Sequence, residues 1–145
     1  MQRNCMRMNL GKNDAGFSLI EVLIALVIIS VGLIGLAALQ ARGLQYNQGS
    51  YLRSQANILA YDMIDRMRIN RDSAQAGNYD LSLSASAPTG STLAAQDLAG
   101  WLGLLADTLP AGDGEVSCNV TLCSVRVTWQ EADGATYEFN YQTRI

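Results

Sequence analysis

A single carboxylate, Glu21, lies at the start of a long apolar segment of this chain. Residues 22–39 carry no charge and are numerous enough to cross a lipid bilayer as a helix. A carboxylate costs about 2.5–3.5 kcal/mol at the bilayer centre and less near an edge, so Glu21 needs a partner. A cut between Gly16 and Phe17 would create an ammonium four residues before Glu21, on the same chain or on a neighbour. The pattern therefore indicates a subunit that assembles through a charge pair.

The composition argues against catalysis and against nucleic-acid binding. The chain has no histidine, which is the commonest general base and metal ligand, and it has no Gly-x-Ser-x-Gly motif or phosphate-binding glycine loop. After a cut at Gly16, seven arginines remain against twelve acidic residues, a net charge of −5, so a basic nucleic-acid footprint is absent. A local patch at Arg66, Arg68 and Arg71 leaves an acidic nucleic-acid-binding module as an alternative. We expect no enzyme activity, no cofactor, no small-molecule substrate and no nucleic-acid partner.

Acidic residues near predicted turns are the remaining candidate ligands. Asp113, Glu115 and Asp133 could bind calcium weakly, but their spacing matches no established calcium loop. Solvated turn carboxylates are the simpler interpretation, and no metal site is predicted.

The first sixteen residues are short, basic and polar, with Arg3, Arg7 and Lys12 against Asp14. A secretory signal has an apolar core of about 7–15 residues and is cut on its far side after small residues. Here the apolar run is longer, and the nearby small-x-small triplet at residues 35–37 lies inside it. A cut before the run leaves the helix in place as an anchor, and the preceding basic residues favour a cytoplasmic N-terminus. A plain single-pass anchor, with Glu21 at the lipid interface, is the alternative.

The helix is predicted to continue beyond the membrane as far as residue 72. No proline interrupts it, and apolar residues recur mostly at steps of three, four and seven, which defines one helical face. That face comprises Leu44, Tyr51, Leu52, Ala56, Leu59, Ala60, Met63, Ile64 and Met67. We expect a membrane half over residues 17–41 and a half outside the membrane over residues 42–72, whose apolar face a domain must cover.

Two features modify this second helical half. Gly43 and Gly49 are expected to weaken the helix locally. Asp62 and Arg66 have the spacing and order of a favourable ion pair on one helix face.

Residues 73–92 are rich in alanine, serine and glycine, contain Pro88 and show no clear period, so they predict a loop. Helical spacing of apolar residues returns after it, with Thr92 as a plausible N-cap and Pro110 as a stop. We therefore expect one short extra helix, with Trp101 in the core.

The last third of the chain alternates apolar and polar residues in three runs, which predicts three antiparallel strands. A three-residue loop at residues 132–134, ending in glycine, suits a type I turn followed by a bulge. With that loop, every apolar side chain falls on one face of the sheet. The expected pairs are Val116 with Val125, Cys118 with Cys123, Trp129 with Tyr137, Val127 with Phe139, and Val125 with Tyr141.

The number and positions of the cysteines are typical of a domain exported to an oxidising compartment. Cys5 lies in the basic leader, so removal of the leader leaves the even pair Cys118 and Cys123, as expected in an oxidising compartment. A disulfide between these two residues would contribute about 2 kcal/mol in the chain-entropy estimate. Two free thiols would instead require a reducing compartment, and a zinc site would require more ligands.

The segment Gly16-Phe17-Ser18-Leu19-Ile20-Glu21-Val22, after its basic leader and before its apolar run, resembles the processing site of type IV prepilins and the related pseudopilins. This resemblance implies that a prepilin peptidase cuts after Gly16 and methylates Phe17. It also implies that Glu21 acts in docking between subunits.

Residues 36–42, 50–56 and 60–71, and later the Trp101 segment and residues 125–129, resemble the PilV family of minor pilins. This likeness covers nearly the whole chain after the cut except the 73–92 loop. Major pilins generally carry a helix-breaking proline in the membrane helix, and this chain has none there.

The resemblance implies an α+β, type IV pilin-like fold: a long N-terminal helix packed on a small antiparallel sheet of about three strands, with one short extra helix. The leader would comprise residues 1–16, and residues 73–145 would form the loop, the short helix and the sheet. The implied partners are the prepilin peptidase, other minor and major pilins and the inner-membrane pilus assembly platform. The implied location is the bacterial inner membrane, with the domain in the periplasm, and then the pilus fibre. A minor pseudopilin of a type II secretion system is the alternative function.

Overall fold

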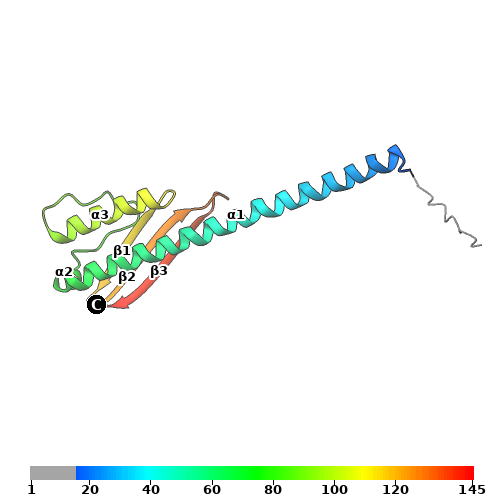
Figure 1. Ribbon diagram of the computed structural model, residues 1–145. Coiled ribbons are helices and arrows are strands. Elements are labelled where there is room, and N and C mark those ends of the chain that lie inside the picture. Colours follow the sequence, from blue (N-terminus) through cyan, green and yellow to red (C-terminus); the bar gives the residue numbers. More distant parts are fainter. Residues whose placement is uncertain (1–15) are drawn as a thin grey trace, which may run out of the picture. The chain divides into compact units, whose positions relative to one another are not determined.

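The computed structural model describes residues 16–145, so the predicted leader lies outside the described residues apart from Gly16. Its elements are α1 (Leu19–Ile69), α2 (Arg71–Gln75), α3 (Leu93–Thr108), β1 (Asp113–Asn119), β2 (Leu122–Gln130) and β3 (Thr136–Arg144) (Figure 1). The chain divides between Ala41 and Arg42 into two compact units, which are described separately below.

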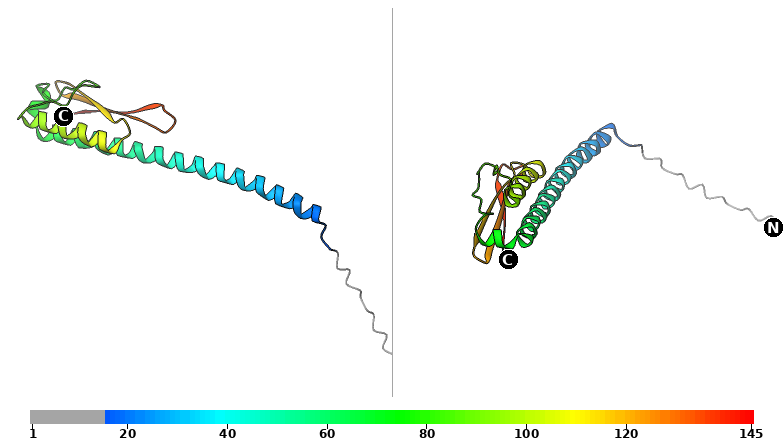
Figure 2. Two further views of the ribbon diagram at one scale, coloured as in Figure 1. Left: turned by 90° about the horizontal axis from the view of Figure 1, so that it is seen from above. Right: turned by 90° about the vertical axis from the view of Figure 1, so that its left-hand side faces the viewer.

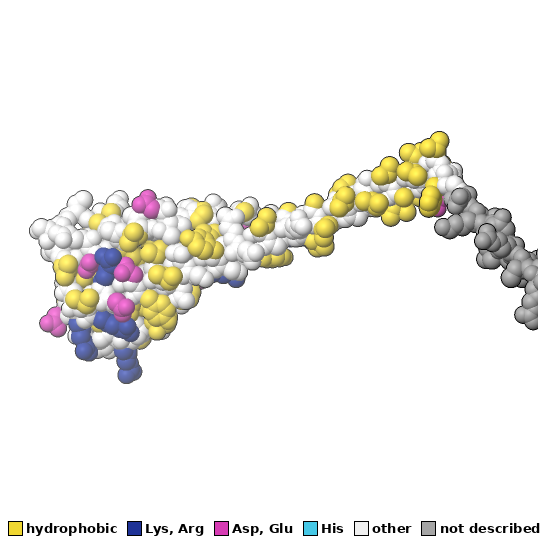
Figure 3. All heavy atoms as spheres, viewed as in Figure 1, with side chains coloured by type: hydrophobic (Ala, Val, Ile, Leu, Met, Phe, Trp, Pro, Cys, Tyr) yellow, Lys and Arg dark blue, Asp and Glu magenta, His cyan; other side chains and the backbone are white. Residues whose placement is uncertain are grey.

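The first unit is the N-terminal part of α1. Its residues are aliphatic or small and contain no proline, which suits a continuous helix, and every side chain from Gly16 to Ala41 is exposed. The hydroxyl of Ser30 donates to the Leu26 carbonyl at 2.7 Å, so this polar group is satisfied within the helix. Among the described residues, α1 alone has the length and apolar composition of a membrane span. Figure 3 shows hydrophobic side chains all along this part of α1.

The second unit, from Arg42 onward, is a two-layer arrangement of helices on a sheet. The three strands are antiparallel in the order β1-β2-β3. The two views of Figure 2 place α3 and the second half of α1 on the same face of this sheet. The core lies between the layers, where Val125, Val127 and Trp129 of β2 are fully or almost fully buried. The fold is therefore the α+β, pilin-like fold expected from the sequence.

The strand registers confirm the predicted pairs. Val116 faces Val125 and Cys118 faces Cys123 between β1 and β2, while Trp129 faces Tyr137 between β2 and β3. The second turn is the three-residue loop predicted. Gly134 has φ of +79° and donates its N–H to the Glu131 carbonyl at 2.9 Å, while the Glu131 N–H donates to the Ala135 carbonyl at 3.1 Å. Glycine tolerates this left-handed conformation without steric cost.

The buried stripe of α1 is shorter than the sequence predicted. It comprises Gly49, Leu52, Ala56, Leu59, Ala60, Met63, Ile64 and Met67. Leu44 and Tyr51 were expected on it but are exposed by 71% and 58%. Leu44 precedes the first residue that the sheet covers, and Tyr51 lies about 100° around the helix from Leu52.

The boundary between helix and loop also differs from the prediction. α1 ends at Ile69 rather than at residue 72, and the five-residue α2 follows after Asn70, so the described chain has two extra helices instead of one. The 73–92 segment is not a free loop, because Tyr79 is fully buried and Leu81 pairs with Val116 in an isolated β-bridge. The sequence did not indicate these two contacts, because small residues around Tyr79 and Leu81 give no clear periodicity.

α3 begins and packs as predicted. The Thr92 hydroxyl accepts the Ala95 N–H at 3.3 Å, which caps the helix. Trp101 is fully buried, and its Nε1–H donates to the Leu59 carbonyl of α1 at 2.9 Å. Gly114 of β1 lies directly against this indole, because a Cβ at that position would overlap the six-membered ring. The absence of a side chain at Gly114 therefore lets α3 approach the sheet.

We predict that Gly114→Ala lowers the free energy of unfolding by about 1–3 kcal/mol, because the added methyl overpacks the core against Trp101. The cost should shrink in a Trp101→Phe background, which removes the overlapped ring. Gly100→Ala on α3 is the matched control: a Cβ there meets nothing within 4 Å, and alanine favours the helix. Urea denaturation of the four variants measures the difference. Equal effects of Gly114→Ala in both backgrounds would contradict the packing argument.

Candidate assembly surface

The candidate processing site lies just before α1. Residues 16–18 are outside the helix, and Phe17 is exposed by 84%. The Ser18 carbonyl accepts the N–H groups of Glu21 at 3.0 Å and Val22 at 3.3 Å, which closes the first helical turn. The Gly16–Phe17 peptide bond is thus held in a non-helical, accessible segment, as a peptidase substrate must be.

Glu21 occupies the first turn of α1 and is the only charged residue of the described chain before Arg42. The positive end of the helix dipole favours a carboxylate at this position. The residues that follow it in the helix, and Ile20 before it, are exposed aliphatic side chains, with Ile20 exposed by 62% and Ile24 by 54%. The arrangement can pair one cation from outside the helix in a medium of low dielectric constant. The cleavage, the methylation of Phe17 and the docking role of Glu21 remain predictions.

In the second unit, a polar network joins α1, α3 and the loop that connects α2 to α3. Arg66 of α1 donates to Asp62 at 2.9 Å and to Asp97 of α3 at 3.3 Å, so the predicted Asp62–Arg66 pair is present. The Tyr79 hydroxyl donates to the second Asp97 oxygen at 2.6 Å and accepts from Asn70 at 3.2 Å. Sequence reasoning missed this network because its members are 31 and 18 residues apart.

The network shifts two pKa values. Burial, together with the hydrogen bond to Asp97, raises the pKa of the Tyr79 hydroxyl. Burial lowers the pKa of Arg66, but its hydrogen bonds to Asp62 and Asp97 outweigh this effect and leave the pKa above its usual value. Both groups therefore keep their protons at neutral pH, and the network stabilises the junction of helix and loop.

Cys118 and Cys123 form a disulfide that joins β1 to β2 beside their connecting turn. Cys123 is fully buried, and the Cys118 sulfur lies 3.9 Å from the sulfur of Met67 on α1. The disulfide thus ties the hairpin to the core as well as closing it.

An open pocket of about 320 Å³ lies between α1 and the β2–β3 turn. Its lining residues are Gln45, Tyr46, Gln48, Gly49, Ser50, Leu52, Arg53, Glu131, Ala132, Asp133 and Tyr137. Glu131 forms one wall: its Oε1 lies 3.5 Å from Nε of Arg53 and accepts Nε1–H of Trp129 at 3.4 Å. A Cβ at Gly49 would lie 2.8 Å from the other Glu131 oxygen. Gly49, expected only to weaken the helix, therefore makes room for this carboxylate against α1.

The three turn carboxylates considered for calcium are engaged separately. Asp113 accepts the N–H groups of Ser84 and Gly114, both at 2.7 Å, and Glu115 pairs with Arg126 at 3.3 Å. The Ala135 N–H and the Tyr137 hydroxyl lower the pKa of Asp133 by donating to it. Within residues 16–145, no three acidic or cysteine side chains gather as a metal site would require.

Two family models match consecutive parts of the chain. The prokaryotic N-terminal methylation motif matches residues 11–37, and the model of type IV pilin Tt1218 matches residues 38–99. The chain is type IV pilin-like. No curated protein and no solved structure gives a significant match.

The type IV pilin family consists of structural subunits, so the two matches support a structural pilin-like subunit rather than an enzyme. The methylation motif implies a prepilin peptidase as processing partner, and the pilin match implies other pilins as neighbours. The motif together with the apolar start of α1 indicates membrane anchoring and association with a pilus.

We predict that Tyr79→Phe lowers the free energy of unfolding at pH 7 by about 1–2 kcal/mol, because Asp97 loses its hydroxyl donor. Tyr46→Phe is the matched control, since Tyr46 is exposed by 76%. Thermal unfolding of both variants in detergent measures the effect. A Tyr79→Phe variant as stable as the control would show that the network does not hold the loop.

The raised pKa of Tyr79 also predicts a pH dependence. A raised folded-state pKa gives stability that is complete below the unfolded tyrosine pKa of about 10 and is lost as the pH rises through the folded value. The melting temperature of the wild-type protein should therefore fall more steeply above about pH 10 than that of Tyr79→Phe. Parallel alkaline profiles of the two proteins would contradict this assignment.

Proposed function

We propose that the chain is a minor pilin of the PilV kind. A prepilin peptidase cuts it between Gly16 and Phe17 and methylates Phe17. Residues 17–41 then hold it in the inner membrane, with the N-terminus at the cytoplasmic side and the domain from Arg42 onward in the periplasm. The inner-membrane assembly platform inserts it into the type IV pilus or into the complex that primes the fibre. Its roles lie in pilus biogenesis, adhesion or twitching motility.

The observation that carries this proposal is the isolated carboxylate at the head of an exposed apolar helix. Glu21 has no cation among the described residues of its own unit, and the aliphatic side chains around it require lipid or other helices as their surroundings. Removal of the leader would supply the cation as the Phe17 ammonium of a neighbouring subunit. Such a pair, formed away from water, favours one axial stagger between adjacent helices, because other staggers leave a charge unpaired.

The uninterrupted helix supports a minor rather than a major pilin. α1 runs from Leu19 to Ile69 without a proline, whereas the resemblance leads us to expect a helix-breaking proline in the membrane helix of major pilins. The segments at residues 60–71 and 125–129 support the PilV kind, and both contribute to the interface between α1 and the sheet.

The disulfide supports the proposed orientation. A bond between Cys118 and Cys123 persists in an oxidising compartment, which for a chain anchored in the inner membrane is the periplasm. The basic residues Arg3, Arg7 and Lys12 before the apolar run favour retention of the N-terminus in the cytoplasm.

We predict that Glu21→Ala is inserted and cleaved normally but enters pili at least about tenfold less. The neighbouring ammonium would be left unpaired in the helix bundle, which costs about 3–5 kcal/mol when one partner of a buried pair is removed. Immunoblots of sheared pili and of membranes, with the variant and wild type expressed at equal levels, measure the ratio.

Glu21→Gln separates charge from shape, because it keeps the side-chain size and should be almost as defective as Glu21→Ala. Ser30→Ala, within the same helix, removes a hydroxyl that bonds only to its own helix and should assemble normally. Wild-type levels of Glu21→Ala in pili would contradict the charge pair. Recovery of the wild-type chain only with a secretion channel would assign it instead to the pseudopilins.

A further inference from the structure

The two edge strands of the sheet differ in whether the backbone groups on their outer sides have hydrogen-bond partners. On the outer edge of β1, Val116 exchanges two backbone hydrogen bonds with Leu81, at 2.8 and 2.9 Å, and the Cys118 N–H donates to the Asp80 carboxylate at 2.8 Å. The loop after α2 therefore closes this edge, as sheets require to avoid unwanted pairing.

The outer edge of β3 has no such cover. In an antiparallel pair, every second residue exchanges backbone hydrogen bonds with the neighbouring strand. Glu131 bonds to Ala135, so in β3 the odd-numbered residues bond to β2. The N–H and C=O groups of the even-numbered residues of β3 therefore point away from β2. The N–H and C=O groups of Glu138, Asn140 and Gln142 have no hydrogen-bond partner among residues 16–145. These are outward-facing groups on a nine-residue strand.

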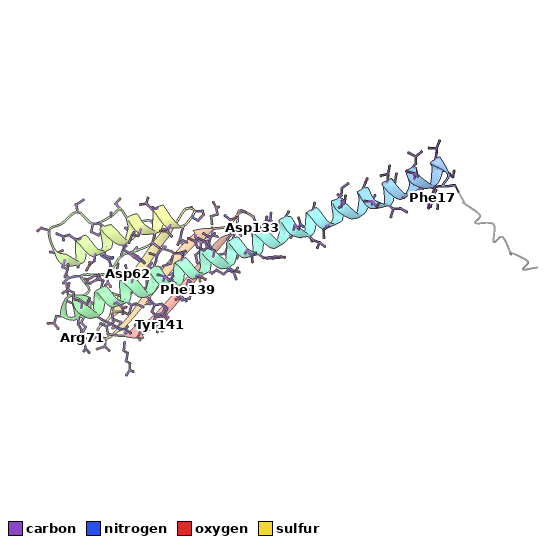
Figure 4. All side chains as sticks on the ribbon, viewed as in Figure 1. Phe17, Asp62, Arg71, Asp133, Phe139 and Tyr141 are labelled. Carbon is purple, nitrogen blue, oxygen red and sulfur yellow. A yellow bond between two sulfur atoms is a disulfide. The ribbon has the colours of Figure 1, made fainter. Side chains whose placement is uncertain are left out.

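The face of β3 turned towards the helices is also incompletely covered. Tyr137, Phe139 and Tyr141 are half-buried, whereas Trp129, Val127 and Val125, their partners on β2, are buried. The Tyr141 ring lies 4.7 Å from the ring of Tyr61 on α1, which is itself exposed by 40%. Figure 4 shows Phe139 and Tyr141 at the margin of α1. One more strand beside β3 would cover this aromatic row and complete the core.

The edge lacks the features by which proteins usually prevent strand addition. β3 contains no proline and no lysine, and the five residues from Phe139 to Thr143 are uncharged. The charges lie near its ends, with Glu138 at the start and Arg144 at the end, both exposed. A strand added at this edge would gain from a basic residue beside Glu138 and an acidic residue beside Arg144.

We infer that β3 accepts an extended segment of another pilin subunit as a fourth strand. This inference rests on the proposed function and specifies its partner surface. The segment alternates apolar and polar residues, so that its apolar side chains cover Phe139 and Tyr141. Backbone hydrogen bonds to Glu138, Asn140 and Gln142 supply the affinity, and the end charges set the register.

The direction of β3 within the sheet-bearing unit argues against a second copy of β3 as the partner. Antiparallel pairing of β3 with itself would set Glu138 of each copy opposite Arg144 of the other, which satisfies the charges. However, β3 and the second half of α1 run in the same direction in both views (Figures 1 and 2), so the pairing would reverse α1 in the second copy. Subunits that repeat head-to-tail along one fibre share one direction, so the partner strand is an extended segment other than β3.

Hydrogen exchange with residue resolution tests the inference on the full chain, in detergent micelles and in purified pili. The N–H groups of Glu138, Asn140 and Gln142 should exchange about tenfold or more slowly in pili. Those of Phe139 and Tyr141, already bonded to β2, should change much less. If the chain is present in pili but all three amides exchange as fast as in micelles, the strand addition is wrong and the proposed function stands. Absence of the chain from pili would overturn the proposed function as well.

Asn140→Pro provides a second test, because it removes an outward N–H without breaking the β2–β3 ladder, and edge strands tolerate proline. Asn140→Thr is the matched control and keeps the N–H. Asn140→Pro should melt like the control yet enter pili about fivefold less or worse. Equal incorporation of the two variants would contradict the inference. A photo-crosslinker at Gln142 should label a strand of another pilin, and a crosslink to a second copy of β3 would overturn the choice of partner.

Discussion

The structure depends on α1 meeting two different environments along one continuous helix. Between Val22 and Leu39 the side chains are apolar or small on every side of the helix except at Ser30, so no single face is suited to water. From Gly49 onward the helix is amphipathic, and one stripe from Leu52 to Met67 is buried under the sheet. Each large apolar side chain on that stripe contributes about 1.5–3 kcal/mol when fully buried. The first part requires lipid or neighbouring helices, and the second requires the strands.

The rest of the sheet-bearing unit serves to hold the strands against that stripe. Trp101 joins α3 to α1 through the Leu59 carbonyl, and Gly114 lets the indole reach the sheet. The network of Arg66, Asp97 and Tyr79 fastens the loop, which in turn closes the outer edge of β1. β3 is left as the open edge, which makes it the surface where a neighbour would complete the core.

Much of this fold follows from local patterns. The alternation of β2 and β3, with glycine at position 134, determines the register, because a shift by one residue would turn Val125 and Val127 to the solvent. The burial of Tyr79 with its bond to Asp97, and the space that Gly49 leaves for Glu131, could not be predicted. Both depend on contacts between segments far apart in the sequence. The end of α1 at Ile69 was also missed, because Asn70 interrupts a segment whose helix propensity continues into α2. At the candidate site, the sequence identifies Glu21 by its isolation, but the cation that we propose for it would exist only after a neighbouring chain had been processed and assembled.

The central claim is that this chain becomes an assembling subunit when its N-terminus is cut and exposed at Phe17. The most direct test is the intact mass and N-terminal sequence of the protein extracted from membranes. The account predicts a chain that begins at methylated Phe17 and is two hydrogens lighter than the reduced form, because Cys118 and Cys123 are joined. A chain that still begins at Met1, or that is cut after Ala37, would contradict it.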